Sequence, residues 1–284
     1  MDNNQASNNT SALKGPSELS SAAWKFFAAN WKILALIALV PAGVRVIASL
    51  FAITIVGLPI AFILVICSAI VTIPMFPALI GAIQRLASEP GAKLSVKEQY
   101  MAGFRLFWPF LLVIILKSLT GIGSLALFVI PGIIVGVYIS MYMFTFMIDG
   151  RRGFAALTES YVLVRGRWWG VFGRSLFLVL IMIGAGIILS LVSLVLVAVG
   201  GILGPIVINL IVYAFFIPFA FSYMYQLYLS LKATRLPDAP TSTFKNWLVA
   251  FLIIGIIAII VIPVLLVSLA LTLVSHSAYV SYPR

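Results

Sequence analysis

The chain has 284 residues, of which 63% are hydrophobic and only 9% are charged, and its mean hydropathy is +1.20. A soluble domain carries about 25% charged residues, so this composition excludes an ordinary water-soluble protein and predicts several membrane spans. The single cysteine, Cys67, excludes an intramolecular disulfide framework, and the net charge of +11 does not indicate nucleic acid, since the basic residues lie between apolar runs.

The first 20 residues form a polar stretch rich in Asn and Ser. They have no basic segment followed by a cleavable apolar core, so we interpret residues 1–20 as a disordered cytoplasmic tail and not as a signal peptide. Several of the apolar runs that follow exceed the roughly 20 residues needed to cross a bilayer. The predicted spans are residues 33–53, 59–83, 107–125, 129–148, 175–199, 205–231 and 247–274.

A repeated pattern accompanies the spans. An amphipathic stretch with tryptophan precedes a pair of apolar segments, and a proline opens the second segment at Pro59, Pro131 and Pro205. Repeats longer than a helix indicate architecture. We therefore predict an all-α polytopic transmembrane helical bundle of six to seven spans with interfacial elbow helices. The single transmembrane domain, 21–275, contains three elbow-plus-hairpin repeats (21–90, 91–150 and 151–235) and a final span at 243–275, before a short tail at 276–284.

The elbows are predicted from the connections that precede the spans. Ser95 and Glu98 have the spacing of a capping box, and apolar residues follow at helical spacing. We expect short amphipathic helices in the headgroup layer, bent into the next span. Two roles stay open for them, an anchor that sets helix tilt or a site of specific lipid recognition. The repeated positions are Glu98, Tyr100 and Trp108 in one connection and Glu159, Tyr161 and Trp169 in the next, with looser copies at Trp24 to Trp31 and at Thr243 to Trp247.

Basic residues are concentrated in alternate connections. Most of the 18 lysines and arginines precede the first span or lie between spans two and three, four and five, or six and seven, whereas the turns near Gly57, Gly123 and Gly200 have none. The positive-inside rule then places the N-terminus and the long connections in the cytoplasm. We predict a multi-pass protein of the bacterial inner, or plasma, membrane, with residues 276–284 outside if the seventh span crosses fully.

Two cations fall inside predicted spans, Arg45 and Lys117. A cation at the bilayer centre costs about 2.5–3.5 kcal/mol on insertion scales, and the predicted spans contain no acidic residue to pair with it. One interpretation is that both side chains reach out to the headgroups. The other is a cavity shared with Asn209 and Gln226 that binds a lipid phosphate or another anion.

The connection between the fourth and fifth spans supplies a second set of candidate anion- or lipid-binding residues. These are Arg151, Arg152, Arg165 and Arg167, which face anionic headgroups if the connection lies at the membrane surface. We expect Asp149 to form a local ion pair or turn beside Arg151 and Arg152. Glu98 and Glu159 are expected to be solvated acids on helix faces.

Small residues indicate where helices pack closely. Gly132, Gly136 and Ser140 have small-xxx-small spacing, as do Gly186 and Ser190. We expect these faces to pack within the chain rather than to form a dimer interface.

Reactive groups are scarce. His276 is the only histidine, which excludes a histidine-based triad or metal cluster. We therefore expect no cofactor and no metal. The first hypothesis is a non-enzymatic protein that organises envelope lipids or acts as a membrane scaffold, with anionic lipids and a membrane protein or second copy as partners. The alternative is a transporter or channel for a small or lipidic anion, and a lipid enzyme comes third.

One segment resembles a known family. Pro131-Gly opens a span, and Asp149-Gly-Arg-Arg-Gly-Phe-Ala-Ala-Leu leads through Ser160 to Gly166-Arg-Trp-Trp169. This pattern resembles the membrane domain of the glycerophosphoryl diester phosphodiesterase membrane-domain family over residues 107–180. The resemblance implies a helical inner-membrane architecture. It does not imply the diesterase activity, because the soluble barrel needs acidic metal ligands and histidines that this chain lacks.

Overall fold

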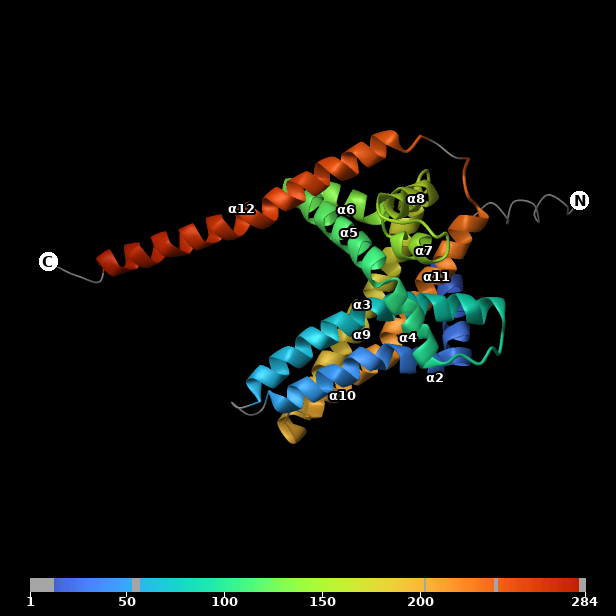
Figure 1. Ribbon diagram of the computed structural model, residues 1–284, viewed down its shortest axis with the longest axis horizontal. Helices are drawn as coiled ribbons and strands as arrows, with labels where there is room; N and C mark the ends of the chain where they lie inside the picture. Colours follow the sequence, from blue (N-terminus) through green and yellow to red (C-terminus); the bar gives the residue numbers. More distant parts are fainter. Residues whose placement is uncertain (1–12, 53–56, 202, 238–239, 281–284) are drawn as a thin grey trace, which may run out of the picture.

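The computed structural model describes residues 13–52, 57–201, 203–237 and 240–280, and these residues form helices joined by short connections (Figure 1). Seven helical segments are long and apolar enough to cross a membrane. The chain is therefore an all-α, multi-pass membrane protein, as its composition predicts. The elements are α2 (Pro16–Phe51), α3 (Leu58–Ser88), α4 (Val96–Arg105), α5 (Phe107–Leu127), α6 (Val129–Tyr138), α7 (Tyr142–Met147), α8 (Phe154–Val164), α9 (Trp168–Gly200), α10 (Leu203–Ile211), the π-helix η1 (Val212–Phe216), α11 (Ile217–Ala233) and α12 (Ser242–Val280).

The helices extend past the predicted spans. Helix α2 already begins at Pro16, with proline in its first turn, where the missing N–H has no helical partner to lose. The Glu18 carboxylate accepts a hydrogen bond from the Gly15 N–H, and Leu19 is fully buried. Residues 16–20, predicted to be part of a disordered tail, therefore belong to the bundle. Residues 1–12 of that predicted tail lie outside the described part of the chain. At the other end, α12 continues into the predicted C-terminal tail.

Two buried cores hold the bundle together. The first lies among α2, α3 and α11, around Leu34, Leu79 and Tyr223. The second lies among α5 to α8 and α12, around Phe110. Phe76 of α3 joins them, because its ring lies 6.5 Å from Phe110 and 5.6 Å from Phe221 of α11, centroid to centroid. Figure 1 shows the two groups diverging, with α5, α6 and α12 on one side and α2, α3 and α10 on the other.

The outer surface of the bundle is apolar. Residues 259–273 of α12 are all exposed, and most of α9 is exposed as well. Such a surface is stable in a bilayer, because lipid tails are as apolar as leucine side chains.

The molecule has two distinct ends. We define the hairpin end by the junctions of α2 with α3, α5 with α6, and α9 with α10, and the basic end by the α3–α4 and α11–α12 connections with the N-terminal part of α2. In Figure 1 the hairpin end lies on the side of the C-terminus and the basic end on the side of the N-terminus. This arrangement matches the alternation of basic and uncharged connections in the sequence.

The elbows differ from prediction in three respects. The segments with Trp24 and Trp247 are not separate elbows, since each continues without a break into α2 or α12. Helices α4 and α8 are separate, but Ser95 makes no capping hydrogen bond through its side chain. Most side chains of α8 are buried within the bundle, Glu159 among them, so this helix is not the amphipathic surface helix that was expected.

Two glycines allow the backbones of α5 and α12 to approach closely. A Cβ atom at Gly123 would overlap the carbonyl oxygen of Phe251, and one at Gly255 would overlap that of Leu119. Of the predicted face with Gly132 and Gly136, Gly132 packs against Leu125 of α5, whereas a Cβ at Gly136 would meet no atom within 4 Å. The face with Gly186 is wrong as a packing site within the described chain, since a Cβ there would meet no atom within 4 Å.

Candidate anion-binding sites

The first candidate site depends on a proline in α2. Pro41 has no N–H, so the carbonyl of Ile37, four residues earlier, loses its helical partner. The hydroxyl of Tyr100, from α4, donates to this carbonyl at 2.8 Å. The Pro41 carbonyl in turn accepts a hydrogen bond from the hydroxyl of Ser68 in α3 at 3.4 Å. The disrupted turn of α2 is thus fixed by two other helices.

Arg45 lies one turn beyond Pro41 and is held by the same contacts. Its Nε donates to Ser68 Oγ at 2.9 Å, and its guanidinium carbon lies 5.3 Å from the centre of the Tyr213 ring. Tyr213 belongs to η1, a π turn that ends two residues before Pro218. Pro218 has no N–H to donate to the carbonyl of Ala214. The guanidinium is therefore oriented by its own helix α2, by α3 and by η1. Its two terminal nitrogens make no hydrogen bond to the described residues.

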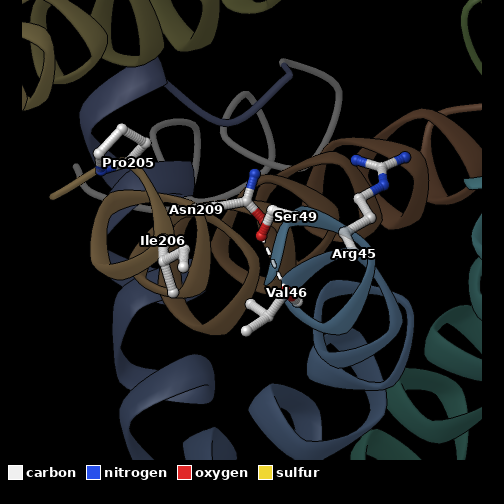
Figure 2. Close-up of a pocket in the computed structure, with 6 residues that line it drawn as sticks. All are labelled: Arg45, Val46, Ser49, Pro205, Ile206 and Asn209. Atoms are coloured by element: carbon white, nitrogen blue, oxygen red, sulfur yellow. Dashed lines mark hydrogen bonds between the residues drawn. The ribbon is translucent and has the colours of Figure 1, made fainter. Parts of the chain in front are cut away.

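Arg45 and Asn209, two of the four residues of the cavity that the sequence offered as one interpretation, line the same pocket. The pocket has a volume of about 220 Å³ and lies between α2 and α10, with Val46, Ser49, Pro205 and Ile206 completing its lining. In Figure 2 the amide nitrogen of Asn209 and the guanidinium of Arg45 project toward the same side. The Asn209 Oδ1 is buried and accepts no hydrogen bond from the described residues, and the Ser49 hydroxyl donates to the Val46 carbonyl at 2.8 Å.

The pocket lies near the hairpin end of the bundle. Arg45 precedes the last residue of α2, Phe51, by a turn and a half or so, which is about 9 Å along the helix axis. Pro205 is in the first turn of α10. This position is compatible with a site at headgroup level in the leaflet at that end.

Lys117 and Gln226 do not belong to this pocket. Lys117, on α5, is half-buried and makes no hydrogen bond or ion pair within the described ranges. Neither residue is among those that line the space beside Arg45. The two intramembrane cations thus do not converge on one site, because α5 belongs to the second core while α2 belongs to the first.

Three of the four candidate arginines at the basic end bind the protein itself. Arg152 donates to the carbonyl of Phe146 at 2.6 Å, with its guanidinium carbon 4.0 Å from the centre of that ring. Arg167 donates to the Thr234 hydroxyl and to the carbonyls of Leu163 and Leu231, and burial lowers its pKa. Arg151 forms an ion pair with Glu159 at 3.5 Å, whereas Arg165 is exposed.

The acidic residues of this end tie α11 to the preceding connection. Asp149 accepts hydrogen bonds from Lys232 at 2.6 Å and from the Tyr228 hydroxyl at 2.8 Å. Asp149 thus lies in the expected local bend, but its ion pair is with α11 and not with Arg151 or Arg152. Glu159 is only 8% exposed and pairs with Arg235 at 2.6 Å, so the prediction of a solvated acid was wrong there. Sequence reasoning missed both partners because they are more than 70 residues away.

The side chains that could bind a metal ion lie apart from one another in the described part of the chain. Within the described ranges no three His, Cys, Asp or Glu side chains gather closely enough to hold a metal ion. Comparisons with family models, with curated proteins and with solved structures find no match to this chain. The resemblance to the glycerophosphoryl diester phosphodiesterase membrane domain is therefore unsupported.

Proposed function

We propose that this chain is a non-enzymatic protein of the bacterial inner membrane that gathers anionic lipids around itself, with its N-terminus in the cytoplasm. The observation that carries the proposal is the set of free cations at the basic end. Asp149 and Glu159 are already neutralised by Lys232, Arg151 and Arg235. Many exposed cations there have no acidic partner among the described residues, namely Lys25, Lys32, Arg85, Lys93, Lys97, Arg105, Arg165 and Lys245.

Free cations beside a membrane attract anionic headgroups. Each Lys or Arg near an anionic leaflet contributes about 1 kcal/mol, and the effect falls off within a Debye length. Exposed tryptophans lie near the same end, including Trp24 on α2 and Trp108 on α5. Tryptophan prefers the headgroup level, which supports placing these cations at the membrane surface.

The test compares two triple variants in nanodiscs that contain equal amounts of phosphatidylglycerol and phosphatidylcholine. One variant carries Lys93→Gln, Lys97→Gln and Arg105→Gln, and the control carries Lys93→Arg, Lys97→Arg and Arg105→Lys. Native mass spectrometry counts the lipids that each protein retains. We expect the neutral variant to retain fewer anionic lipids than the wild type, while the charge-preserving control retains the same number. Equal retention by all three proteins would reject the proposal.

The pocket beside Arg45 favours a second candidate function, a transporter or channel for a small or lipidic anion. Such a protein would show anion flux in proteoliposomes, and Arg45→Gln would reduce that flux several-fold. The location of the pocket near one end of α2 favours binding over passage, because a carrier site usually lies near the bilayer midplane. Absence of flux in the wild type would remove this candidate.

A further inference from the structure

We infer that the pocket between α2 and α10 binds the phosphate of a phospholipid from the leaflet at the hairpin end. This inference rests on the proposed role in lipid organisation and assigns it a second, separate site. The free cations discussed above all lie at the basic end, so they do not account for a cation held beside a pocket at the opposite end.

The pocket offers unpaired hydrogen-bond donors beside one unpaired acceptor, the buried Asn209 Oδ1. The terminal nitrogens of Arg45 make no hydrogen bond to the described residues, and in Figure 2 the Asn209 amide nitrogen projects to the same side. A phosphate group has only acceptor oxygens and a negative charge, so it suits such a pair. Arginine is also the residue that binds phosphate most readily with two parallel hydrogen bonds.

The cation is positioned before any ligand arrives. Ser68, which holds the Arg45 Nε, is only 1% exposed and is itself bonded to the Pro41 carbonyl. The Tyr213 ring lies under the guanidinium. A side chain that only reached out to solvent would need none of these contacts. Fixing it in advance lowers the entropy lost on binding.

The surroundings favour a lipid over a free anion. Val46, Pro205 and Ile206 make the pocket wall mostly apolar, and the neighbouring residues Ile47 and Val207 are exposed on the bundle surface. A volume of about 220 Å³ suits a phosphate with its glycerol linkage, while the acyl chains lie along the apolar surface outside. Inorganic phosphate has the same oxygens but nothing to bury against these walls.

The test measures lipid retained by single variants. Arg45→Gln and Asn209→Leu remove donors of the pocket, and Lys117→Gln is a matched control that removes the other intramembrane cation. Each protein is released from nanodiscs of phosphatidylglycerol and phosphatidylcholine and analysed by native mass spectrometry, with and without inorganic phosphate. Thermal unfolding confirms that each variant is folded. We expect each pocket variant to lose the most tightly held anionic lipid, with affinity about tenfold or more weaker, and Lys117→Gln to retain it.

Three outcomes would overturn the inference. The first is retention of that lipid by both folded pocket variants, which would mean that Arg45 only reaches the headgroups. The second is its loss from Lys117→Gln as well, which would indicate a general charge effect. The third is its displacement by millimolar inorganic phosphate, which would assign the pocket to a free anion. The neutral triple variant at Lys93, Lys97 and Arg105 tests the proposed function separately. It should lose the lipids bound at the basic end and keep the lipid bound in the pocket.

Discussion

At the scale of single residues, Pro41 does more than bend a helix. Its missing N–H leaves the Ile37 carbonyl for Tyr100, and its own carbonyl binds Ser68, which holds Arg45. Prolines are tolerated in membrane helices when neighbours satisfy the freed groups. Here the neighbours come from α3 and α4, so the hydrogen bonds around Pro41 join three helices, α2, α3 and α4.

Tyr100→Phe should therefore lower stability, because the Ile37 carbonyl then stays buried without a donor, at a cost of about 1–2 kcal/mol. In a Pro41→Ala background the new N–H of Ala can bind that carbonyl, so the same Tyr100→Phe change should cost much less. Thermal unfolding of the four proteins measures this coupling. An equal cost in both backgrounds would contradict the assignment.

The Tyr100 hydrogen bond also predicts a pH dependence. Burial raises the pKa of this phenol above its ordinary value, which is about 10. A raised pKa favours the protonated group in the folded state, so its contribution is complete below about pH 10 and falls as the pH rises further. The wild type should lose more stability than Tyr100→Phe between pH 9 and 11, and parallel loss would argue against this contribution.

Glu159→Gln provides a second test at this scale. The carboxylate is buried and bridges Arg151 and Arg235, and these two cations are partly exposed, so the loss should be about 1–2 kcal/mol. Glu98→Gln is the matched control, since Glu98 is exposed and forms no ion pair with the described residues. Equal unfolding temperatures for both variants would show that the buried ion pairs contribute nothing.

At the scale of helices, α12 is held mainly by its contact with α5. Gly123 and Gly255 let the two backbones touch, and beyond Ala258 the helix leaves the bundle, with residues 259–273 exposed (Figure 1). In a membrane, helix association depends on such close packing, because lipid removes the hydrophobic force between helices. The attachment of α12 therefore depends on a short region of small residues.

Gly123→Leu and Gly255→Leu should each separate α12 from α5. A side chain there meets backbone atoms that cannot move aside, so we expect a loss of about 3 kcal/mol or more, at or above the upper end of ordinary overpacking. Gly184→Leu on α9 is the control, since a Cβ there meets no atom within 4 Å. Thermal unfolding in one detergent compares them, and similar stability of all three variants would refute this contact.

At the scale of the whole molecule, the two ends differ in charge as well as in position. The basic end carries the ion pairs and the free cations, and the hairpin end carries the pocket beside Arg45. This polarity predicts one orientation in a membrane with an anionic cytoplasmic leaflet.

The orientation can be measured with single cysteines in a Cys67→Ser background. Ser88→Cys and Thr158→Cys should stay unlabelled by an impermeant maleimide added to intact cells, because the positive-inside rule places both in the cytoplasm. Leu127→Cys, at the end of α5, should be labelled. Permeabilised cells provide the control for reactivity, and labelling of Ser88→Cys in intact cells would reverse the orientation.

The sequence by itself determined the fold class, the spans and the candidate residues Arg45 and Asn209. These features depend on local composition, since a bilayer requires about 20 apolar residues per crossing and makes every intramembrane cation conspicuous. The same constraint predicted six to seven spans, and seven helical segments are long and apolar enough to cross. Composition also separated the basic connections from the uncharged turns, and these lie toward opposite ends of the molecule in Figure 1.

Only the tertiary structure decided which residues meet. The missing N–H of Pro41 is visible in the sequence. The donors to the Ile37 and Pro41 carbonyls, Tyr100 and Ser68, are not, because they lie on other helices. The Glu159 and Asp149 ion pairs and the glycine contact of α5 with α12 were missed for the same reason. Helical periodicity indicates which face of a helix is apolar, whereas the neighbour on that face depends on how all the helices pack together.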